Sequence, residues 1–174
     1  MASPGEEYSY NTGISQLLSG IVQKATGMRA DSFALQNIFT PLGIDEYYWP
    51  ISNEGVAFGG SGVRMTPRDM AKFGYLYLMN GEWDGDQIVP ESWVEVSQQK
   101  HMARKFIPDN YYGYQFWVSD YGLYSAVGFE GQWIMILPEH DLVVVFNNNF
   151  VEGDNLQWTT PERLLTTYII PAIK

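Results

Sequence analysis

The sequence contains no cysteine, and only 10 of its 174 residues are Lys or Arg. The first absence excludes disulfides, thiolate zinc sites and cysteine nucleophiles, although it leaves the cellular compartment open. Against them stand 20 Asp and Glu, so the formal charge is −10 and there is no basic cluster, which makes nucleic acid a poor candidate partner. Charged residues are only 17% of the chain, which indicates surface built to be covered.

Long apolar runs are lacking as well. The longest, such as Leu142 to Phe146, are far too short to cross a bilayer, and the first residues resemble no signal peptide. A content of 45% hydrophobic and 16% aromatic residues predicts a packed globular protein, and a chain of this length buries roughly two-thirds of its unfolded surface. Because the chain begins at a Pro-Gly turn motif, we expect it to start inside a longer protein.

Helical periodicity dominates residues 1–109. Apolar residues at helical spacing predict a helix over Gly13 to Thr26, capped by Gly27 and with an apolar face that needs a partner. Further helices are expected from Asp31 or Ser32 as N-cap to about residue 40, from Thr66-Pro67 to about residue 80, and from Pro90 to about residue 100.

The pattern changes in residues 110–174. Segments rich in aromatic and β-branched residues predict strands at 112–119, 121–128, 132–137 and 141–147, the last two joined by a turn at 138–141. A C-terminal helix is expected to begin at Thr159 to Pro161. These elements predict an α+β fold, one domain or part of one, in which helices pack on an antiparallel sheet of three or four strands.

The apolar segment from Leu142 to Phe146 is typical of a central strand with both faces buried. Such a strand needs neighbours on both sides, more than this chain is expected to supply. We therefore expect an exposed sheet edge through which the chain can associate with itself.

The order of motifs resembles the serine β-lactamase-like family, which includes class C β-lactamases, D-Ala-D-Ala peptidases and related esterases and amidases. The resemblance covers the whole chain: PGEEYSYNTG before the first helix, FTPLGI, GGSG, MTPRDMAKFG, GFEGQ and ILPEHDLVVV. It implies a β-lactamase/transpeptidase-like sandwich and a serine hydrolase that works through an acyl-enzyme. By resemblance alone, the compartment is periplasmic or extracellular.

The resemblance also implies roles for individual residues. Tyr10 matches the tyrosine base of the family, and Thr12 matches the polar third position of its motif, where asparagine is more familiar. Tyr8 is the competing choice of base. The backbone N–H of Gln132 matches the oxyanion donor.

The remaining candidates concern the substrate. Phe129, Glu130 and Gly131 match the substrate-lining strand motif, but a ring and an acid replace the family's lysine or histidine. This departure favours an esterase or amidase over a β-lactamase or peptidase. Aromatic side chains are candidates for the wall of a substrate cleft, and we assign Trp158 to substrate binding, among Tyr47, Tyr48, Trp49, Trp117 and Trp158.

The family's nucleophile belongs to a Ser-x-x-Lys motif that precedes the tyrosine, and none precedes it here. The only such pattern, Ser97 to Lys100, follows the tyrosine, and Ser61 in GGSG lacks a nucleophile-elbow pattern. Asp84 and Asp86 lie near Gly85 without the spacing of a calcium loop, so we expect neither metal nor other cofactor.

These residues predict the C-terminal part of a serine hydrolase that is inactive until its N-terminal part is supplied. Its substrate would be a small ester, amide or lactam. The alternative is a non-catalytic, hydrolase-like module that binds a ligand or a protein partner.

Overall fold

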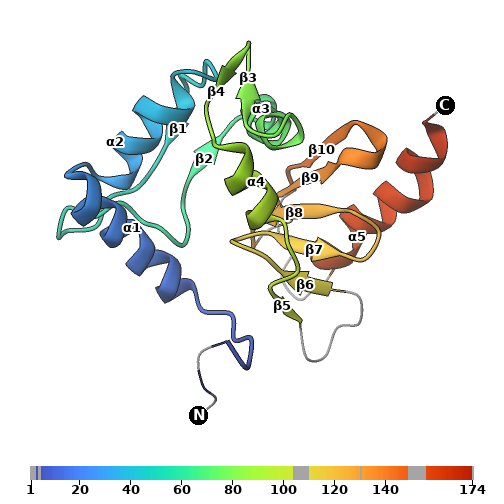
Figure 1. Cartoon of the computed structure of the whole chain (residues 1–174), viewed down its shortest axis with the longest axis horizontal. Helices are drawn as coiled ribbons and strands as arrows, with labels where there is room; N and C mark the ends of the chain where they lie inside the picture. Colours follow the sequence, from blue (N-terminus) through green and yellow to red (C-terminus); the bar gives the residue numbers. More distant parts are fainter. Residues whose placement is uncertain (1–2, 4, 104–109, 130, 149–155, 174) are drawn as a thin grey trace. The chain divides into compact units, whose positions relative to one another are not determined.

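The structure is a computed structural model that describes residues 3, 5–103, 110–129, 131–148 and 156–173, with the side chains of 156–158 left out (Figure 1). The chain forms two compact units. The first comprises residues 1–8 and 70–174, and the second comprises residues 9–69. The predicted helical part, residues 1–109, therefore contributes to both units. In the part of the chain that the structure describes, no helix combines the length and the apolarity needed to span a membrane.

The second unit is built around α1 (Thr12–Thr26), which has the predicted extent to within one residue. Asn11 is its N-cap, and Gly27 ends it with a φ of 73°, a left-handed conformation that suits glycine. A helix α2 (Ala30–Ala34), a π-helical turn (Leu35–Phe39) and the short strands β1 (Tyr47–Tyr48) and β2 (Arg64–Met65) complete the unit.

The predicted N-cap of α2 is wrong. The helix begins at Ala30, after Arg29, and Asp31 lies in its first turn instead of capping it. The guanidinium of Arg29 donates to both carboxylate oxygens of Asp31, at 2.9 and 2.8 Å. This bidentate pairing engages the carboxylate that a cap would need, and it holds the pKa of Asp31 below its usual value.

The first unit contains an antiparallel sheet of six strands in the order β10-β9-β8-β7-β6-β5, more than the three or four expected. Five connected strands follow β5 (Met102–Ala103): β6 (Asn110–Tyr112), β7 (Trp117–Ser119), β8 (Tyr124–Val127), β9 (Trp133–Leu137) and β10 (Leu142–Phe146). The predicted strand at 112–119 is split in two by a tight turn. In this turn the Gly113 N–H donates to the carbonyl of Phe116 and Gln115 has a φ of 66°.

Helices cover both faces of this sheet. On one face, Tyr77 of α3 (Pro67–Leu78) and Val94 of α4 (Glu91–Ser97) pack with Ile134 and Ile136. On the other, Leu165 packs with Trp133, Met135 and Leu137. Alternate residues of β9 thus face opposite layers, and all five are buried. Leu165 opens a π-helical turn (Leu165–Ile169) after α5 (Leu156–Leu164), which is followed by a 3₁₀ turn (Ile170–Ala172).

Two boundaries differ from the prediction. The C-terminal helix α5 begins at Leu156 and contains Pro161 in its interior, so the Thr-Pro pair does not open it. Between α3 and α4, for which no strands are predicted, the chain forms a small hairpin of β3 (Glu82–Trp83) and β4 (Asp86–Gln87). Asp84 and Gly85 form the two-residue loop of this hairpin, and both have a positive φ.

Residues 142–146 have one neighbouring strand where their apolar sequence is suited to two, which agrees with the expected exposed sheet edge. β10 lies at the end of the six-stranded order and pairs only with β9 among the described strands. Its five residues are each half-buried, whereas β9 is the fully buried strand.

Candidate active site

The start of α1 presents the predicted base. Tyr10 is 59% exposed and stands directly before the N-cap, and Thr12 is the first helical residue. Asn11 lies one residue before Thr12, which occupies the motif position where asparagine is more familiar. The Asn11 side chain accepts a hydrogen bond from the Gly13 N–H at 2.8 Å. The motif therefore combines an accessible phenol with a helix cap, and the cap fixes where the helix begins.

A glycine-rich loop holds this helix start in place. The N–H of Gly59 donates to the side-chain oxygen of Gln16 at 2.9 Å, and Gln16 and Ser19 both donate to the carbonyl of Ala57. Gly60 runs so close to Thr12 that an added Cβ would lie 2.4 Å from its methyl carbon. The loop thus locks the first two turns of α1, which is why two consecutive glycines are needed there.

Sequence reasoning missed Gln16 and Ser19, the two polar side chains that carry this link. Both lie on the side of α1 that contacts the loop, and Ser19 is the only residue of the helix that is buried. Gln16 and Ser19 are three residues apart and therefore share one side of the helix, and this polar pair was the available signal. A polar group that becomes buried needs a hydrogen-bond partner.

Tyr8, the competing base, is an aromatic packing residue of the first unit. Its ring lies 5.0 Å from that of Tyr112 and 6.2 Å from that of Trp117, and Tyr112 and Trp117 also contact each other. Trp117, a candidate for a cleft wall, is therefore part of this cluster. Tyr8 and Tyr10 consequently differ in surroundings although they are two residues apart: one ring is packed and the other is exposed.

The substrate motif lies in a turn and not on a strand, which corrects the prediction. Phe129 and Gly131 fall between β8 and β9, Phe129 is 68% exposed, and Gly131 has a φ of 76°. The N–H of Gly128 donates to the carbonyl of Gln132 at 2.7 Å and closes the turn. Gln132 immediately precedes β9, and its side-chain amide donates to the carbonyl of Asn148.

Asn148 is a second residue that the sequence analysis missed. Its side-chain amide donates to the carbonyl of Gly131 at 3.1 Å, so the segment after β10 is tied twice to the turn. Two further predicted residues cannot be placed: Glu130 lies outside the described residues, and Trp158 belongs to α5 with its side chain outside them.

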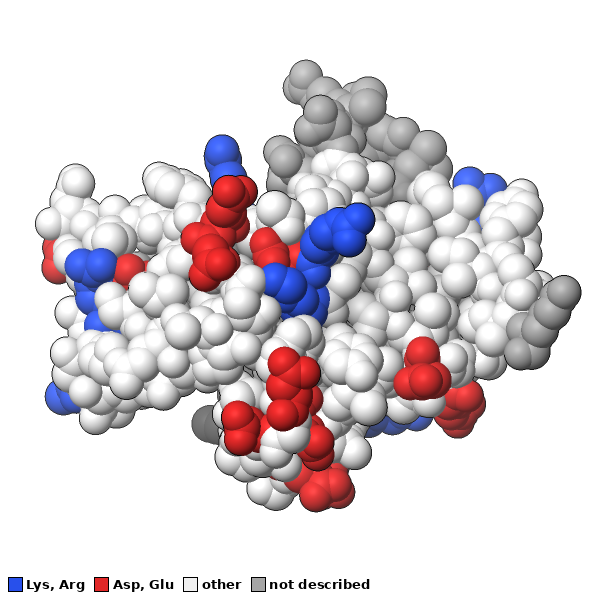
Figure 2. Space-filling model, turned by 90° about the horizontal axis from the view of Figure 1, so that it is seen from above, with Lys and Arg blue, Asp and Glu red and all other residues white. Residues whose placement is uncertain are grey.

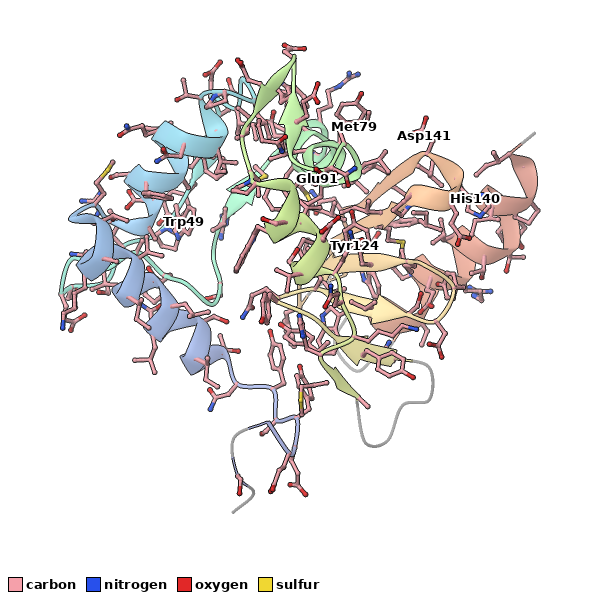
Figure 3. The ribbon with its side chains drawn as sticks, viewed as in Figure 1. Trp49, Met79, Glu91, Tyr124, His140 and Asp141 are labelled. Carbon is pink, nitrogen blue, oxygen red and sulfur yellow. The ribbon has the colours of Figure 1, made fainter. Side chains whose placement is uncertain are left out.

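The other aromatic candidates have structural contacts in the second unit. The indole N–H of Trp49, labelled in Figure 3, donates to the carbonyl of Phe58 at 2.7 Å, and the ring of Tyr47 packs on Phe39. Tyr48 is 58% exposed and lies beneath the guanidinium of Arg64.

Ser97 is not a nucleophile in this structure. It is fully buried, and its hydroxyl donates to the carbonyl of Val94. Lys100 pairs instead with Asp120 and lies over the ring of Tyr111. Ser97 therefore stabilises the C-terminus of α4, and Lys100 makes its contacts with Asp120 and Tyr111. These structural roles agree with the sequence argument that this Ser-x-x-Lys pattern, which follows the tyrosine, is not the catalytic one.

The predicted site residues form two groups, one in each unit. Tyr10 and Thr12 share the start of α1, and Phe129, Gly131 and Gln132 share the turn between β8 and β9. In the described residues no group of three His, Asp or Glu side chains is arranged to hold a metal ion.

Comparison with known proteins identifies relatives along nearly the whole chain. A family model described as Beta-lactamase matches residues 1–163. The 6-aminohexanoate-dimer hydrolase of Paenarthrobacter ureafaciens is 26% identical over 163 residues, which are 87% of this chain and 42% of that protein.

Two solved structures show the fold. A putative 6-aminohexanoate-dimer hydrolase from Bacillus anthracis matches 95% of this chain and 45% of its own, with 28% identity and a TM-score of 0.84. An octameric penicillin-binding protein homologue from Pyrococcus abyssi matches 95% of this chain and 44% of its own, with 20% identity and a TM-score of 0.76. The chain thus spans less than half the length of these relatives.

Proposed function

Because the chain belongs to the Beta-lactamase family, we propose that it forms part of a serine hydrolase that cleaves an ester or amide through an acyl-enzyme. Two similar proteins are named for hydrolysis of a 6-aminohexanoate dimer, and the residues of such a dimer are joined by an amide bond. A linear amide is therefore the first substrate to test. The motif at 129–131 lacks the lysine or histidine that the family places there, and this departure favours an ester or amide over a β-lactam.

Tyr10 carries the proposal as the general base. Its side chain is 59% exposed, while the helix start behind it is fixed by the Asn11 cap and the Gly59-Gly60 loop. A base must combine access to its proton donor with a held position, and this residue has both. In the proposed reaction, Tyr10 takes the proton of the serine hydroxyl as the serine oxygen attacks the substrate carbonyl. The proton then passes to the leaving group as the ester or amide bond breaks and the acyl-enzyme forms.

The other residues bind the reacting groups. The backbone N–H of Gln132 holds the oxyanion of the tetrahedral intermediate, and the hydroxyl of Thr12 donates to the substrate. Phe129, Glu130, Gly131 and Trp158 contact the substrate. The nucleophilic serine comes from outside this chain, because Ser97 is buried and bonded to Val94. The 174-residue chain is therefore inactive alone.

The test joins this chain to the portion of the B. anthracis protein that its match leaves uncovered. The hybrid and the chain alone are assayed with the linear 6-aminohexanoate dimer, a chromogenic short-chain ester and a chromogenic cephalosporin. We expect hydrolysis of the amide or ester by the hybrid alone. A serine-reactive phosphonate should label the hybrid and not the chain.

Tyr10→Phe and Tyr8→Phe are a matched pair in this hybrid. Removing the base should lower kcat by roughly 10²–10⁴-fold, whereas Tyr8→Phe keeps the aromatic packing and should change kcat by less than about threefold. An equal or larger loss in Tyr8→Phe would show that the base is misassigned. Turnover by the chain alone would refute the external nucleophile, and an unlabelled, inactive hybrid would favour a non-catalytic binding module.

A further inference from the structure

A pocket of about 320 Å³ opens between the end of α3 and the β3–β4 hairpin, within the first unit. Its lining combines two aromatic rings, a thioether, two acidic residues and a glycine: Tyr75, Met79, Glu82, Trp83, Asp84 and Gly85. None of these residues belongs to the candidate active site. The volume is at the lower end of the range for small-molecule sites, so this hairpin pocket is suited to a small ligand.

Two aromatic rings form adjacent walls of the hairpin pocket. The ring planes of Tyr75 and Trp83 meet at 85°, and their centroids are 5.8 Å apart. Tyr75 is 45% exposed and Trp83 is half-buried, so parts of both rings remain open to a ligand. Met79, which is labelled in Figure 3 and is 40% exposed, adds a further apolar surface. An alkyl chain can pack on these side chains, and the face of an aromatic ring attracts a cation.

The charge around the pocket has one sign. Glu82 and Asp84 line the pocket, and both are exposed. Residues 73–99 contain five acidic residues and no Lys or Arg. Figure 2 looks from above onto the end where the hairpin lies in Figure 1, and it shows a group of acidic side chains near the lower edge of this face with no basic side chain inside the group. The pocket therefore favours a cation over a neutral or anionic ligand.

The hairpin that carries half of the lining is held in place by hydrogen bonds. The side-chain amide of Gln87 donates to the carbonyls of Asn80 and Val89, at 2.8 and 2.6 Å. The N–H groups of Ile88 and Val89 both donate to the carbonyl of Gly81. An added Cβ at Gly81 would lie 2.0 Å from the carbonyl oxygen of Val89, so the two strands meet closely at this point. A ligand thus meets a preformed pocket, which lowers the entropic cost of binding.

We propose that the hairpin pocket binds a primary alkylammonium ion. Its ammonium group pairs with the carboxylates of Glu82 and Asp84, and its alkyl stem packs on the two rings and the thioether. A primary ammonium is favoured over a quaternary one because it donates hydrogen bonds to carboxylates, and because two ring walls do not enclose a trimethylammonium group. The site shares no residue with the proposed hydrolysis and goes beyond it.

Hexylammonium is the probe, and it is titrated into the ¹⁵N-labelled 174-residue chain. The indole N–H signals are followed by NMR, and the signal of Trp83 is identified by its loss in Trp83→Phe. We expect this signal to shift with a Kd on the order of 1 mM, because the pocket is small and open to solvent. Hexanol and hexanoate should bind at least about fivefold more weakly. No shift at millimolar hexylammonium, or equal binding of hexanol, would overturn the proposal.

Asp84→Asn and Asp141→Asn are a matched pair. Both aspartates are exposed and have nearly the same positive φ, 50° and 48°, which asparagine tolerates, but Asp141 does not line the pocket. Asp84→Asn should weaken the binding of hexylammonium by about two- to fivefold, as expected for one exposed ion pair, and Asp141→Asn should bind like the original chain. An equal loss in both variants would show that the net charge of the surface attracts the ligand, and it would overturn the site.

Tyr75→Leu tests the aromatic wall. It removes the ring but keeps an apolar side chain, so the affinity for hexylammonium should fall by about two- to fivefold. An unchanged affinity would overturn the role of the ring. The remaining ¹⁵N spectrum reports whether the variant is folded, and the aspartate pair keeps the proposal testable if it is not.

Two further ligands identify the cation. Tighter binding of tetramethylammonium than of hexylammonium would overturn the assignment to a primary ammonium. A free alkylamine and a lysine side chain share the proposed chemistry, and Nα-acetyl-lysine methylamide separates them. An affinity equal to that of hexylammonium would support a lysine side chain as the source of the ligand, and an affinity at least about fivefold lower would support a free alkylamine.

Discussion

The contact between Gly59 and α1 predicts opposite effects for two glycine-to-alanine substitutions. A Cβ added at Gly59 would lie 2.1 Å from the carbonyl oxygen of Ser15 and 2.8 Å from the Cβ of Ser19. Carbon atoms are in optimal contact only at about 3.5–4.0 Å, so the loop must move by about 1 Å. At Gly20, inside the same helix, an added Cβ meets nothing within 4 Å.

The cost at Gly59 has two components. Overpacking of this kind costs about 1–3 kcal/mol. Displacing the loop also weakens the hydrogen bond from the Gly59 N–H to Gln16, whose net contribution is about 0.5–1.5 kcal/mol. We therefore expect Gly59→Ala to lower the free energy of unfolding by about 2–4 kcal/mol. Gly20→Ala should raise it by about 0.5–1 kcal/mol, because alanine is the better helix former.

The assay is urea unfolding followed by circular dichroism at 222 nm, with the m-value of each variant compared with that of the original chain. Gly20→Ala controls for the added methyl group in general. A Gly59→Ala variant that unfolds within about 0.5 kcal/mol of the original would refute the conclusion that the loop is locked against α1.

Two further predictions concern pH. Hydrogen bonds from Arg29 lower the pKa of Asp31, so this carboxylate contributes stability above its unfolded pKa of about 3.8, and that contribution is lost as the pH falls through the lower folded value. Arg29→Met should make the urea midpoint depend less on pH between pH 2 and 5. An unchanged pH dependence would contradict the pairing. Burial raises the pKa of Tyr124, and burial followed by the hydrogen bond to Glu162 raises that of Tyr121. The contribution of these two phenols to stability should therefore be constant below about pH 10 and fall above it, where the unfolded phenols ionise first. Both groups should absorb as phenolates at 295 nm only on unfolding. Tyr121→Phe should make the alkaline loss shallower; the same slope as the original chain would show that Tyr121 titrates normally.

Local patterns determined most elements of the fold. The 3.6-residue spacing in α1, with Gly27 after it, defined that helix to within one residue, because cap and periodicity are both local properties. The hairpin of β9 and β10 followed from its turn for the same reason. The order of motifs also argued against Ser97 as the nucleophile, because its Ser-x-x-Lys pattern follows Tyr10, and the burial of Ser97 agrees with this.

Only tertiary contacts could decide the remainder. The position of β10 depends on which strands are available as neighbours, so an apolar sequence suited to a central strand stands at an edge here. The turn at Gly113 gave two strands where the composition predicted one, since β-propensity does not register a chain reversal.

The candidate site shows the same division. The Tyr-Asn-Thr-Gly sequence by itself determined a helix start with a tyrosine before it, because N-capping is read from adjacent residues. It could not show that the Asn11 side chain accepts the capping hydrogen bond, or that Gln16 and Ser19 bind the loop 41 and 38 residues away. Nor could it show that Phe129 lies in a turn. Those outcomes depend on segments far apart in the chain, and they become fixed only when buried polar groups find partners in the folded protein.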